Sequence, residues 1–179
     1  MPDTHGKLVI LDRDGVINHD SPDYIKSPDE WIPISGSIEA IARLSQAGYR
    51  IYLATNQAGV GRGLFSEETL HDIHDKLEQA VENAGGRIEA IFYCPHHPDD
   101  GCGCRKPAPG MLMDIAEHAG VDIRGQVYVG DSMKDIEAAR AAGCKPVLVL
   151  TGNGAHTQRV LHGDVDIYDD LAAFAEHLS

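Results

Sequence analysis

The stretch Lys7–Asn18, KLVILDRDGVIN, decides how the rest of the chain is interpreted. Four apolar residues, Leu8–Leu11, are followed by Asp12 and Asp14, which stand two positions apart. An apolar run of this length that ends at a turn is typical of a buried strand. Two carboxylates so close together repel each other and lose hydration when they are buried. The pair therefore indicates either a bound counter-ion or a solvated turn.

Short apolar runs alternate with longer helical patterns along the chain. We predict strands at Leu8–Leu11, Ile51–Thr55, Ile88–Tyr93, Val127–Gly130 and Val147–Leu150. We predict helices at Ser37–Ala47, Ser66–Ala84, Pro109–Ala119, Met133–Ala142 and Leu171–Leu178. This order predicts parallel strands joined by right-handed crossovers. The expected fold is α/β with a doubly wound, mostly parallel sheet, in one domain over residues 1–179.

The composition limits the partners that the protein can bind. The chain has 28 acidic and 15 basic residues, a net charge of −13. This balance disfavours sequence-independent binding of nucleic acid, which depends on phosphate neutralisation. The apolar runs are too short to cross a bilayer, and the N-terminus lacks a secretory signal pattern. We therefore expect a cytoplasmic protein whose partner is a small molecule, not nucleic acid or a membrane.

Polar side chains follow four of the predicted strands at the point where each strand ends. They are Asp12 and Asp14, Thr55-Asn56-Gln57, Arg105-Lys106, and Asp131-Ser132. Taken singly, such residues are most often turn formers, helix caps or surface charges. Ligands of open parallel sheets bind outside the carboxyl ends of the strands. The shared position of all four groups at that edge predicts a ligand site.

These side chains make chemical sense as a phosphoryl-transfer site. Asp12, Asp131 and a backbone carbonyl near Asp14 offer the hard oxygen ligands that Mg²⁺ prefers. Asp12 can attack phosphorus to give an aspartyl-phosphate. Asp14 can protonate the leaving alkoxide and then take a proton from the hydrolytic water. Thr55 would hold non-bridging oxygens, and Lys106 would balance charge in the transition state.

Three of the four cysteines lie in CPHHPDDGCGC, residues 94–104. Without signs of secretion, such a group indicates metal binding in preference to a disulfide. Cys94, His96, Cys102 and Cys104 would make a closed tetrahedral set, typical of structural zinc. A Cys–Cys pair or free thiols on a loop are the alternative interpretations, and His97 competes with His96 for the fourth position.

Four segments, DRDGVIN, ATNQAG, CRKPAPGM and VGDSMKD, resemble the four motifs of the haloacid dehalogenase (HAD) superfamily of phosphatases. The resemblance covers Lys7 to about Leu150. Within the superfamily, the chain is most similar to the D,D-heptose 1,7-bisphosphate phosphatase family, which removes the 7-phosphate in lipopolysaccharide core heptose synthesis. The resemblance implies Mg²⁺, a zinc loop that favours His96, a monomeric cytoplasmic enzyme and no separate cap domain.

The resemblance also implies roles for individual residues. By motif match, the nucleophile falls on Asp12 and the general acid–base on Asp14, while Thr55 and Lys106 fall on the phosphoryl-stabilising positions. Magnesium falls on Asp12, the main-chain carbonyl of Asp14, and Asp131. Phosphoryl-transfer ATPases of similar fold place threonine at the acid–base position, so Asp14 favours a phosphatase.

Substrate specificity must come from loops, because a chain of this length leaves no room for a large lid. We expect Arg105 to hold a second phosphate, since a guanidinium matches two phosphate oxygens at once. The other expected substrate contacts are Asp20, Tyr24, Asn56, Gln57, Arg62 and Ser132. Some relatives have lysine where this chain has Ser132. This difference leaves open which anomer of the sugar the chain prefers.

Other functions fit parts of the same pattern. A histidinol-phosphate phosphatase would share both the motifs and the zinc loop. A DNA 3′-phosphatase would need a basic, aromatic-rich strip, which the net charge of −13 disfavours. A phospho-accepting signalling domain or a zinc-dependent protein-binding module would lack steady turnover. Asp14 favours the enzyme, because it is placed to destroy an acyl phosphate.

Overall fold

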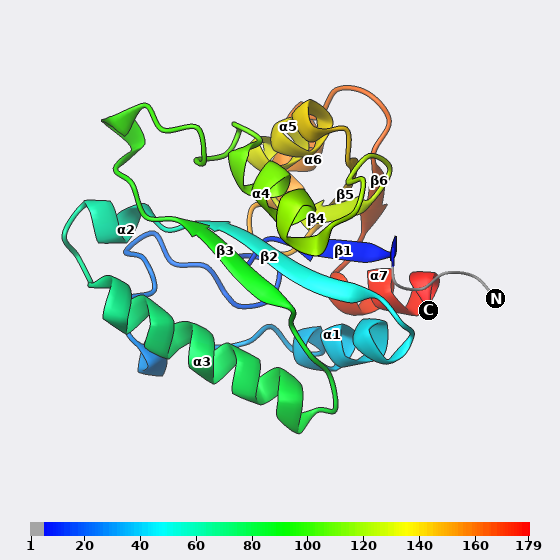
Figure 1. Cartoon of the computed structure of the whole chain (residues 1–179), viewed down its shortest axis with the longest axis horizontal. Coiled ribbons are helices and arrows are strands. Elements are labelled where there is room, and N and C mark those ends of the chain that lie inside the picture. Colours follow the sequence, from blue (N-terminus) through cyan, green and yellow to red (C-terminus); the bar gives the residue numbers. More distant parts are fainter. Residues whose placement is uncertain (1–5) are drawn as a thin grey trace.

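The computed structural model describes residues 6–179, whose six strands form one parallel sheet (Figure 1). The strand order is β3-β2-β1-β4-β5-β6. The strands are β1 (Leu8–Leu11), β2 (Arg50–Asn56), β3 (Ala90–Cys94), β4 (Val127–Gly130), β5 (Lys145–Val149) and β6 (Asp166–Tyr168). The direction of winding reverses between β1 and β4, which is where ligands of such sheets bind.

Seven α-helices occur in the described residues. They are α1 (Ser37–Gln46), α2 (Ala58–Gly61), α3 (Glu67–Asn83), α4 (Gly110–Ala119), α5 (Met133–Ala142), α6 (Gly154–Val160) and α7 (Leu171–Leu178). Short 3-10 helices span Pro28–Glu30 (η2) and Pro98–Asp100 (η3). No helix within residues 6–179 is both long and apolar enough to serve as a membrane span.

Helices cover both faces of the sheet, as a doubly wound fold requires (Figure 1). Val9 and Leu11 of β1 pack in a core with the apolar residues of α1, α3 and α7. Leu8 and Ile10 point to the other face, where α4 and α5 supply the apolar residues. Alternate residues of a strand face opposite sides, so a strand buried on both faces is apolar throughout. This explains the uninterrupted apolar run of β1.

The doubly wound parallel sheet predicted from the sequence is confirmed, and the strand and helix positions agree apart from their ends. The sequence missed β6, a three-residue edge strand in which Asp166 and Ile167 are exposed. It also missed α2 and α6, which are short and contain glycine. Short, polar or glycine-containing elements give little periodic signal, because tertiary contacts decide their conformation.

Two glycines shape the packing at the carboxyl ends of β1 and β4: Gly15 lets the loop after β1 approach the Asp131 loop, and Gly130 lets Asp135 of α5 pack against the end of β4. Gly15 has a φ of +84°, which strongly favours glycine, and a Cβ there would collide with the carboxylate of Asp131. A Cβ at Gly130 would collide with the side chain of Asp135. The close packing of these two loops brings the carboxylates of β1 and β4 together.

Candidate active site

A cavity of about 590 Å³ opens at the carboxyl ends of the central strands. It is lined by the residues expected from the sequence: Asp12, Asp14, Asp20, Tyr24, Thr55, Asn56, Gln57, Arg105, Lys106, Asp131 and Ser132. These residues come from the end of β2 and from the loops after β1, β2, β3 and β4. The sheet edge therefore brings together side chains that lie more than a hundred positions apart in the chain.

Arg62 is the exception among the expected substrate contacts. It does not line this cavity; it is exposed and closes the C-terminal end of α2, where its backbone N–H donates to Ala58 O. The expected contact between Arg62 and substrate therefore stays a prediction that this cavity does not support.

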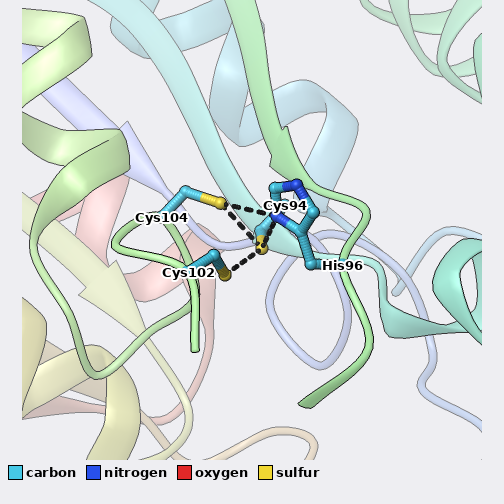
Figure 2. Close-up of side chains that lie close together, drawn as sticks. All are labelled: Cys94, His96, Cys102 and Cys104. Atoms are coloured by element: carbon cyan, nitrogen blue, oxygen red, sulfur yellow. Dashed lines mark hydrogen bonds between the residues drawn. The ribbon is translucent and has the colours of Figure 1, made fainter. Parts of the chain in front are cut away.

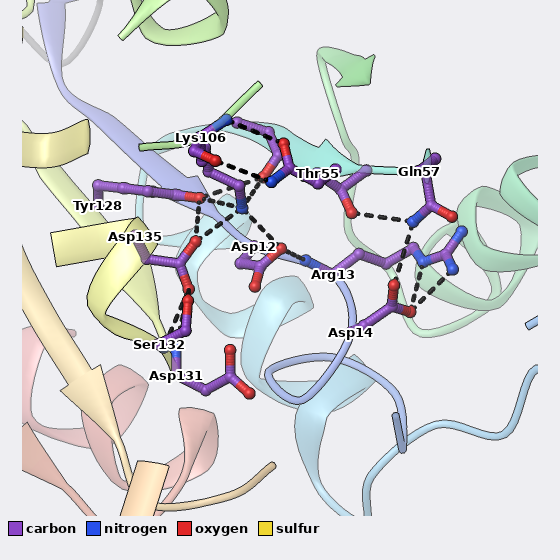
Figure 3. A network of polar contacts seen from close by, with 12 residues as sticks. Asp12, Arg13, Asp14, Thr55, Gln57, Lys106, Tyr128, Asp131, Ser132 and Asp135 are labelled. Atoms are coloured by element: carbon purple, nitrogen blue, oxygen red, sulfur yellow. Dashed lines mark hydrogen bonds and ion pairs between the residues drawn. The ribbon is translucent and has the colours of Figure 1, made fainter. Parts of the chain in front are cut away.

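Lys106 is the cation at the centre of the site (Figure 3). Its Nζ lies 3.0 Å from Asp12 Oδ1 and 2.6 Å from Asp135 Oδ1. It also donates to Tyr128 Oη at 2.7 Å and Ala54 O at 3.0 Å. Burial alone would lower the pKa of Lys106, but the two carboxylates outweigh burial and hold this pKa above its usual range. Lys106 is therefore a permanent positive charge beside Asp12.

The carboxylates around Lys106 carry more negative charge than one lysine can neutralise. Ligand oxygens of Asp12, Asp131 and Asp135 all lie within 4.8 Å of one another. Burial, together with Asp135, raises the pKa of Asp12 and raises that of Asp131 to about 7. Such crowding of hard oxygen donors suits a divalent cation, which would favour the charged forms of both groups.

Asp135 is the functional residue to which the sequence reasoning gave no role. Its Oδ1 accepts from Lys106 and Tyr128, and its Oδ2 accepts from the backbone N–H groups of Asp131 and Ser132 and from Ser132 Oγ. Both oxygens are thus engaged within the protein, so Asp135 orients Lys106 and the Asp131 loop. The Ser132-to-Asp135 spacing of a capping box was the available signal.

Asp14 lies on the side of Asp12 away from Asp135, and its partners differ from those of Asp135 (Figure 3). Its Oδ1 accepts from Arg13 Nε at 2.9 Å, from Arg13 Nη2 at 2.8 Å and from Asn18 Nδ2 at 2.9 Å. Its Oδ2 accepts from Gln57 Nε2 at 3.1 Å, and this same nitrogen lies 3.0 Å from Thr55 Oγ1. Burial alone would raise the pKa of Asp14, but the charge of Arg13 and the hydrogen bonds from Asn18, Arg13 and Gln57 together outweigh burial and lower it.

The far rim of the cavity is cationic. Arg105 and Lys134 line both the main cavity and a smaller one of about 300 Å³, which is also lined by Pro98, Gly101 and Cys102. Burial lowers the pKa of Lys134, and the charges of Arg105 and Lys106 lower it further. Within the described residues, the buried Nη1 of Arg105 has no hydrogen-bond partner. This rim has donors to spare for an anionic group of a ligand.

Cys94, His96, Cys102 and Cys104 form a second cluster, which we call the cysteine cluster (Figure 2). Cys104 Sγ lies 2.9 Å from Cys94 Sγ and 3.1 Å from His96 Nδ1. Cys94 Sγ lies 3.5 Å from Cys102 Sγ. One ligand atom from each residue falls within 4.8 Å of the others, and all four thiols of the protein are free. Three sulfurs and one imidazole at this spacing fit a closed tetrahedral zinc set.

His97 is occupied elsewhere and does not join the cysteine cluster. Its Nδ1 accepts from the backbone N–H of Asp99 at 3.1 Å, and its own backbone N–H donates to Asp100. These two contacts form a capping box at the start of η3. The geometry therefore selects His96, as the resemblance implied.

Comparison with known proteins gives full-length relatives. The HAD-hydrolase-like family model matches residues 103–174. The chain is 56% identical over 174 residues to a D-glycero-beta-D-manno-heptose-1,7-bisphosphate 7-phosphatase of Bordetella bronchiseptica, covering 96% of this chain and 97% of the relative. It is 58% identical over 172 residues to the protein of the same name from Pseudomonas aeruginosa, with the same coverage.

Solved structures agree with these relatives. The crystal structure of D,D-heptose 1,7-bisphosphate phosphatase from B. bronchiseptica, complexed with magnesium and phosphate, superposes with a TM-score of 0.94 at 56% identity and covers 96% of this chain and 97% of that chain. The Burkholderia thailandensis enzyme of the same name superposes with a TM-score of 0.76 at 45% identity, with the same coverage.

Proposed function

The chain belongs to the family of D-glycero-beta-D-manno-heptose-1,7-bisphosphate 7-phosphatases, and we propose that it hydrolyses the C7 phosphate of the heptose bisphosphate for which these enzymes are named. This makes it a phosphoric monoester hydrolase of the HAD type. The observation that carries the proposal is the convergence of Asp12, Asp14, Thr55, Lys106 and Asp131 on one cavity. The expected place of the reaction is the synthesis of ADP-heptose and the lipopolysaccharide core.

Hydrolysis proceeds in two displacements at phosphorus. Asp12 attacks phosphorus while the bond to the C7 oxygen breaks, and Asp14 protonates that oxygen as it leaves. Asp14 then takes a proton from water, whose oxygen bonds to phosphorus and displaces Asp12. Lys106 stabilises negative charge on the transferred phosphoryl group, and Thr55 donates to its oxygens.

Magnesium fits the carboxylates on the inner side of the cavity. Asp12 and Asp131 are the ligands we propose, together with the main-chain carbonyl of Asp14. When bound, Mg²⁺ neutralises charge on the phosphate and on these carboxylates. Crowding of Asp12, Asp131 and Asp135 around a single lysine supports the assignment. The relative crystallised with magnesium and phosphate supports it as well.

Zinc is the metal we propose for the cysteine cluster, in a structural role. The protein supplies all four ligand atoms, which leaves no position for water or substrate. Cys104 is followed directly by Arg105 and Lys106. A metal that orders the loop would therefore also fix the backbone positions of Arg105 and Lys106.

The cationic rim suits the second phosphate of the substrate. With Lys106 engaged at the reacting phosphate, Arg105 is free to bind the phosphate at C1, with Lys134 beside it. Asp20, Tyr24, Asn56, Gln57 and Ser132 line the space between and are the proposed partners of the sugar hydroxyls. The relatives' name designates the beta anomer, which we propose here too. A monomeric state, a single domain and a cytoplasmic location stay predictions.

Specificity constants measured side by side test this function. With Mg²⁺ present, the largest kcat/KM should be that for beta-heptose 1,7-bisphosphate, above the alpha anomer and above histidinol phosphate. A higher value for histidinol phosphate would favour the alternative enzyme. Arg105→Ala should raise KM for the bisphosphate far more than for heptose 7-phosphate. Equal effects on both would remove the argument for a second phosphate site.

A further inference from the structure

Arg13 is the buried residue between the two aspartates of the first motif, and its side chain joins Asp14 to helix α3. It is completely buried. Its Nε and Nη2 both donate to Asp14 Oδ1, at 2.9 and 2.8 Å, while Nη1 lies 3.1 Å from His74 Nε2. His74 is itself 5% exposed and comes from the apolar face of α3. The chain Asp14–Arg13–His74 thus runs from the cavity into the core (Figure 3 shows its first two members).

The chemistry of arginine fixes the state of His74. A guanidinium has only donors, so His74 Nε2 must accept and the ring must be neutral, with its proton on Nδ1. Burial, and then the charge of Arg13, lower the pKa of His74 to about 3. The ring therefore stays an acceptor at every pH at which the enzyme works.

Asp14 is left with one oxygen for chemistry. Its Oδ1 already accepts three hydrogen bonds, two from Arg13 and one from Asn18. Its Oδ2 accepts one, from Gln57. An oxygen with three donors is a poor carrier for a proton, whereas Oδ2 has the capacity and belongs to a group that lines the cavity.

We propose that His74 is a positioning residue for the acid–base step: it holds the Arg13 guanidinium in the orientation that presents Asp14 Oδ2 to the leaving oxygen. The inference rests on the proposed function, since it assumes that Asp14 is the acid–base. The pKa of Asp14 is lowered in the free protein, so Oδ2 takes up its proton when the anionic phosphate of the substrate binds beside it. In the first step, this proton passes to the leaving oxygen as its bond to phosphorus breaks. In the second, Oδ2 regains a proton from water as the new oxygen–phosphorus bond forms and the bond to Asp12 breaks.

His74 interrupts an otherwise apolar face of α3. Its neighbours on that face, including Ile73 and Leu77, are apolar and fully buried. A buried polar ring costs free energy unless its hydrogen bonds are made, and leucine here would leave the buried Nη1 of Arg13 without this acceptor. The acceptor that histidine adds is thus directed at Arg13.

Leaving-group dependence tests the proposal in the magnesium-loaded enzyme. Alkoxides need a proton to leave, whereas p-nitrophenolate is a stable anion and needs none. His74→Leu should therefore lower kcat about tenfold or more for heptose bisphosphate and glycerol 1-phosphate, part of the factor that acid–base catalysis supplies. The loss for p-nitrophenyl phosphate should be smaller, and KM should change little. His74→Gln, whose amide oxygen can accept from Arg13, should restore the alkyl-to-aryl ratio.

The matched control is His71→Leu. His71 lies one turn earlier on α3, is exposed, and contacts Tyr93 Oη at 3.1 Å. It should leave the ratio unchanged. Equal losses of His74→Leu on alkyl and aryl substrates, or failure of His74→Gln to restore the ratio, would overturn the proposal. Glycerol 1-phosphate keeps the test separate from the proposed function, which fails on its own if wild-type enzyme ignores the heptose bisphosphate.

A measurement on the wild-type protein covers the case in which His74→Leu does not fold. Long-range ¹H–¹⁵N correlation spectra report which ring nitrogen of a histidine carries the proton. His74 should show the Nδ1–H tautomer and no charged form down to pH 5. A proton on Nε2 would contradict the proposal, because that nitrogen could not then accept from Arg13.

Discussion

The carboxylate site, which we define as Asp12, Lys106, Asp131 and Asp135, and the cysteine cluster each contain candidate metal ligands, but the fold holds them in different ways. All four members of the carboxylate site are buried. Asp12 and Asp131 directly follow strands and Asp135 lies in the first turn of α5, whereas Lys106 reaches the site from the loop between β3 and α4. In the cysteine cluster only Cys94 is buried and only Cys94 belongs to a strand. The other members lie on the loop between β3 and α4.

This difference shows what each cluster requires for its order. The sheet core fixes the three aspartates, and Lys106 supplies an internal counter-charge to them that does not require a metal at the carboxylates. Three of the four members of the cysteine cluster lie outside the buried core, so we expect the geometry of this loop to depend on a bound ion. Because Arg105 and Lys106 follow Cys104 directly, loss of order in the loop should reach the cavity through the cations.

The largest effect should come from Asp14→Asn, which removes the acid–base group and leaves the cysteine cluster unchanged. An amide cannot give or take the proton, so kcat should fall about 10²–10⁴-fold, the usual contribution of acid–base catalysis. Steady-state assays with Mg²⁺ measure the loss, and elemental analysis should find the zinc content unchanged. Activity near that of wild type would exclude Asp14 as the acid–base.

Lys106→Met tests whether internal charge pairing holds the carboxylate site. Removing one partner leaves Asp12 and Asp135 as buried, unpaired carboxylates, so the free energy of unfolding should fall by about 3–5 kcal/mol. Urea denaturation without Mg²⁺ measures this change. The matched control is Lys145→Met, which removes an exposed pair with Asp166 (2.9 Å) and should cost less than about 1 kcal/mol. Equal losses in the two variants would mean that burial of the pair is unimportant.

Zinc removal should separate the two clusters. A zinc-selective chelator, with Mg²⁺ in excess, should loosen the loop, so trypsin should cut after Arg105 before the sheet unfolds. Mass spectrometry locates the cut, and circular dichroism follows the sheet. A sheet that unfolds together with the loop would contradict a purely local role for the metal, and an unchanged cutting rate would show that the loop is ordered without it.

The smallest effect concerns the pH dependence of stability. In the unfolded chain His74 binds a proton below about pH 6.5, but in the folded protein its pKa is lowered to about 3. Unfolding therefore takes up a proton between these values, and the stability of the wild type falls as the pH drops. From pH 7 to 5 this one group should remove about 2 kcal/mol. His74→Gln should lack this loss, and parallel curves for the two proteins would contradict the buried, neutral ring.

The sequence predicted most of the fold and the reacting groups because both leave local patterns. Short apolar runs that alternate with helical patterns indicate a parallel α/β sheet, and polar residues at the ends of the strands indicate the edge of the sheet where ligands bind. The roles of Asp135, Arg13 and His74 could not be read this way. Each depends on a partner that only tertiary packing supplies, such as Lys106, 29 positions from Asp135, or Arg13, 61 positions from His74. Arg62 lies outside the cavity for the related reason that the sequence does not fix the direction of a side chain among glycines.

Trapping the covalent intermediate is the most direct test of the central claim that Asp12 is the nucleophile. Enzyme, Mg²⁺ and heptose 1,7-bisphosphate are mixed, quenched with acid within the first turnover, and reduced with borohydride, which converts an acyl phosphate into an alcohol. Peptide mass spectrometry should then find homoserine at position 12. Homoserine at another position, or steady phosphate release by Asp12→Asn, would contradict the account.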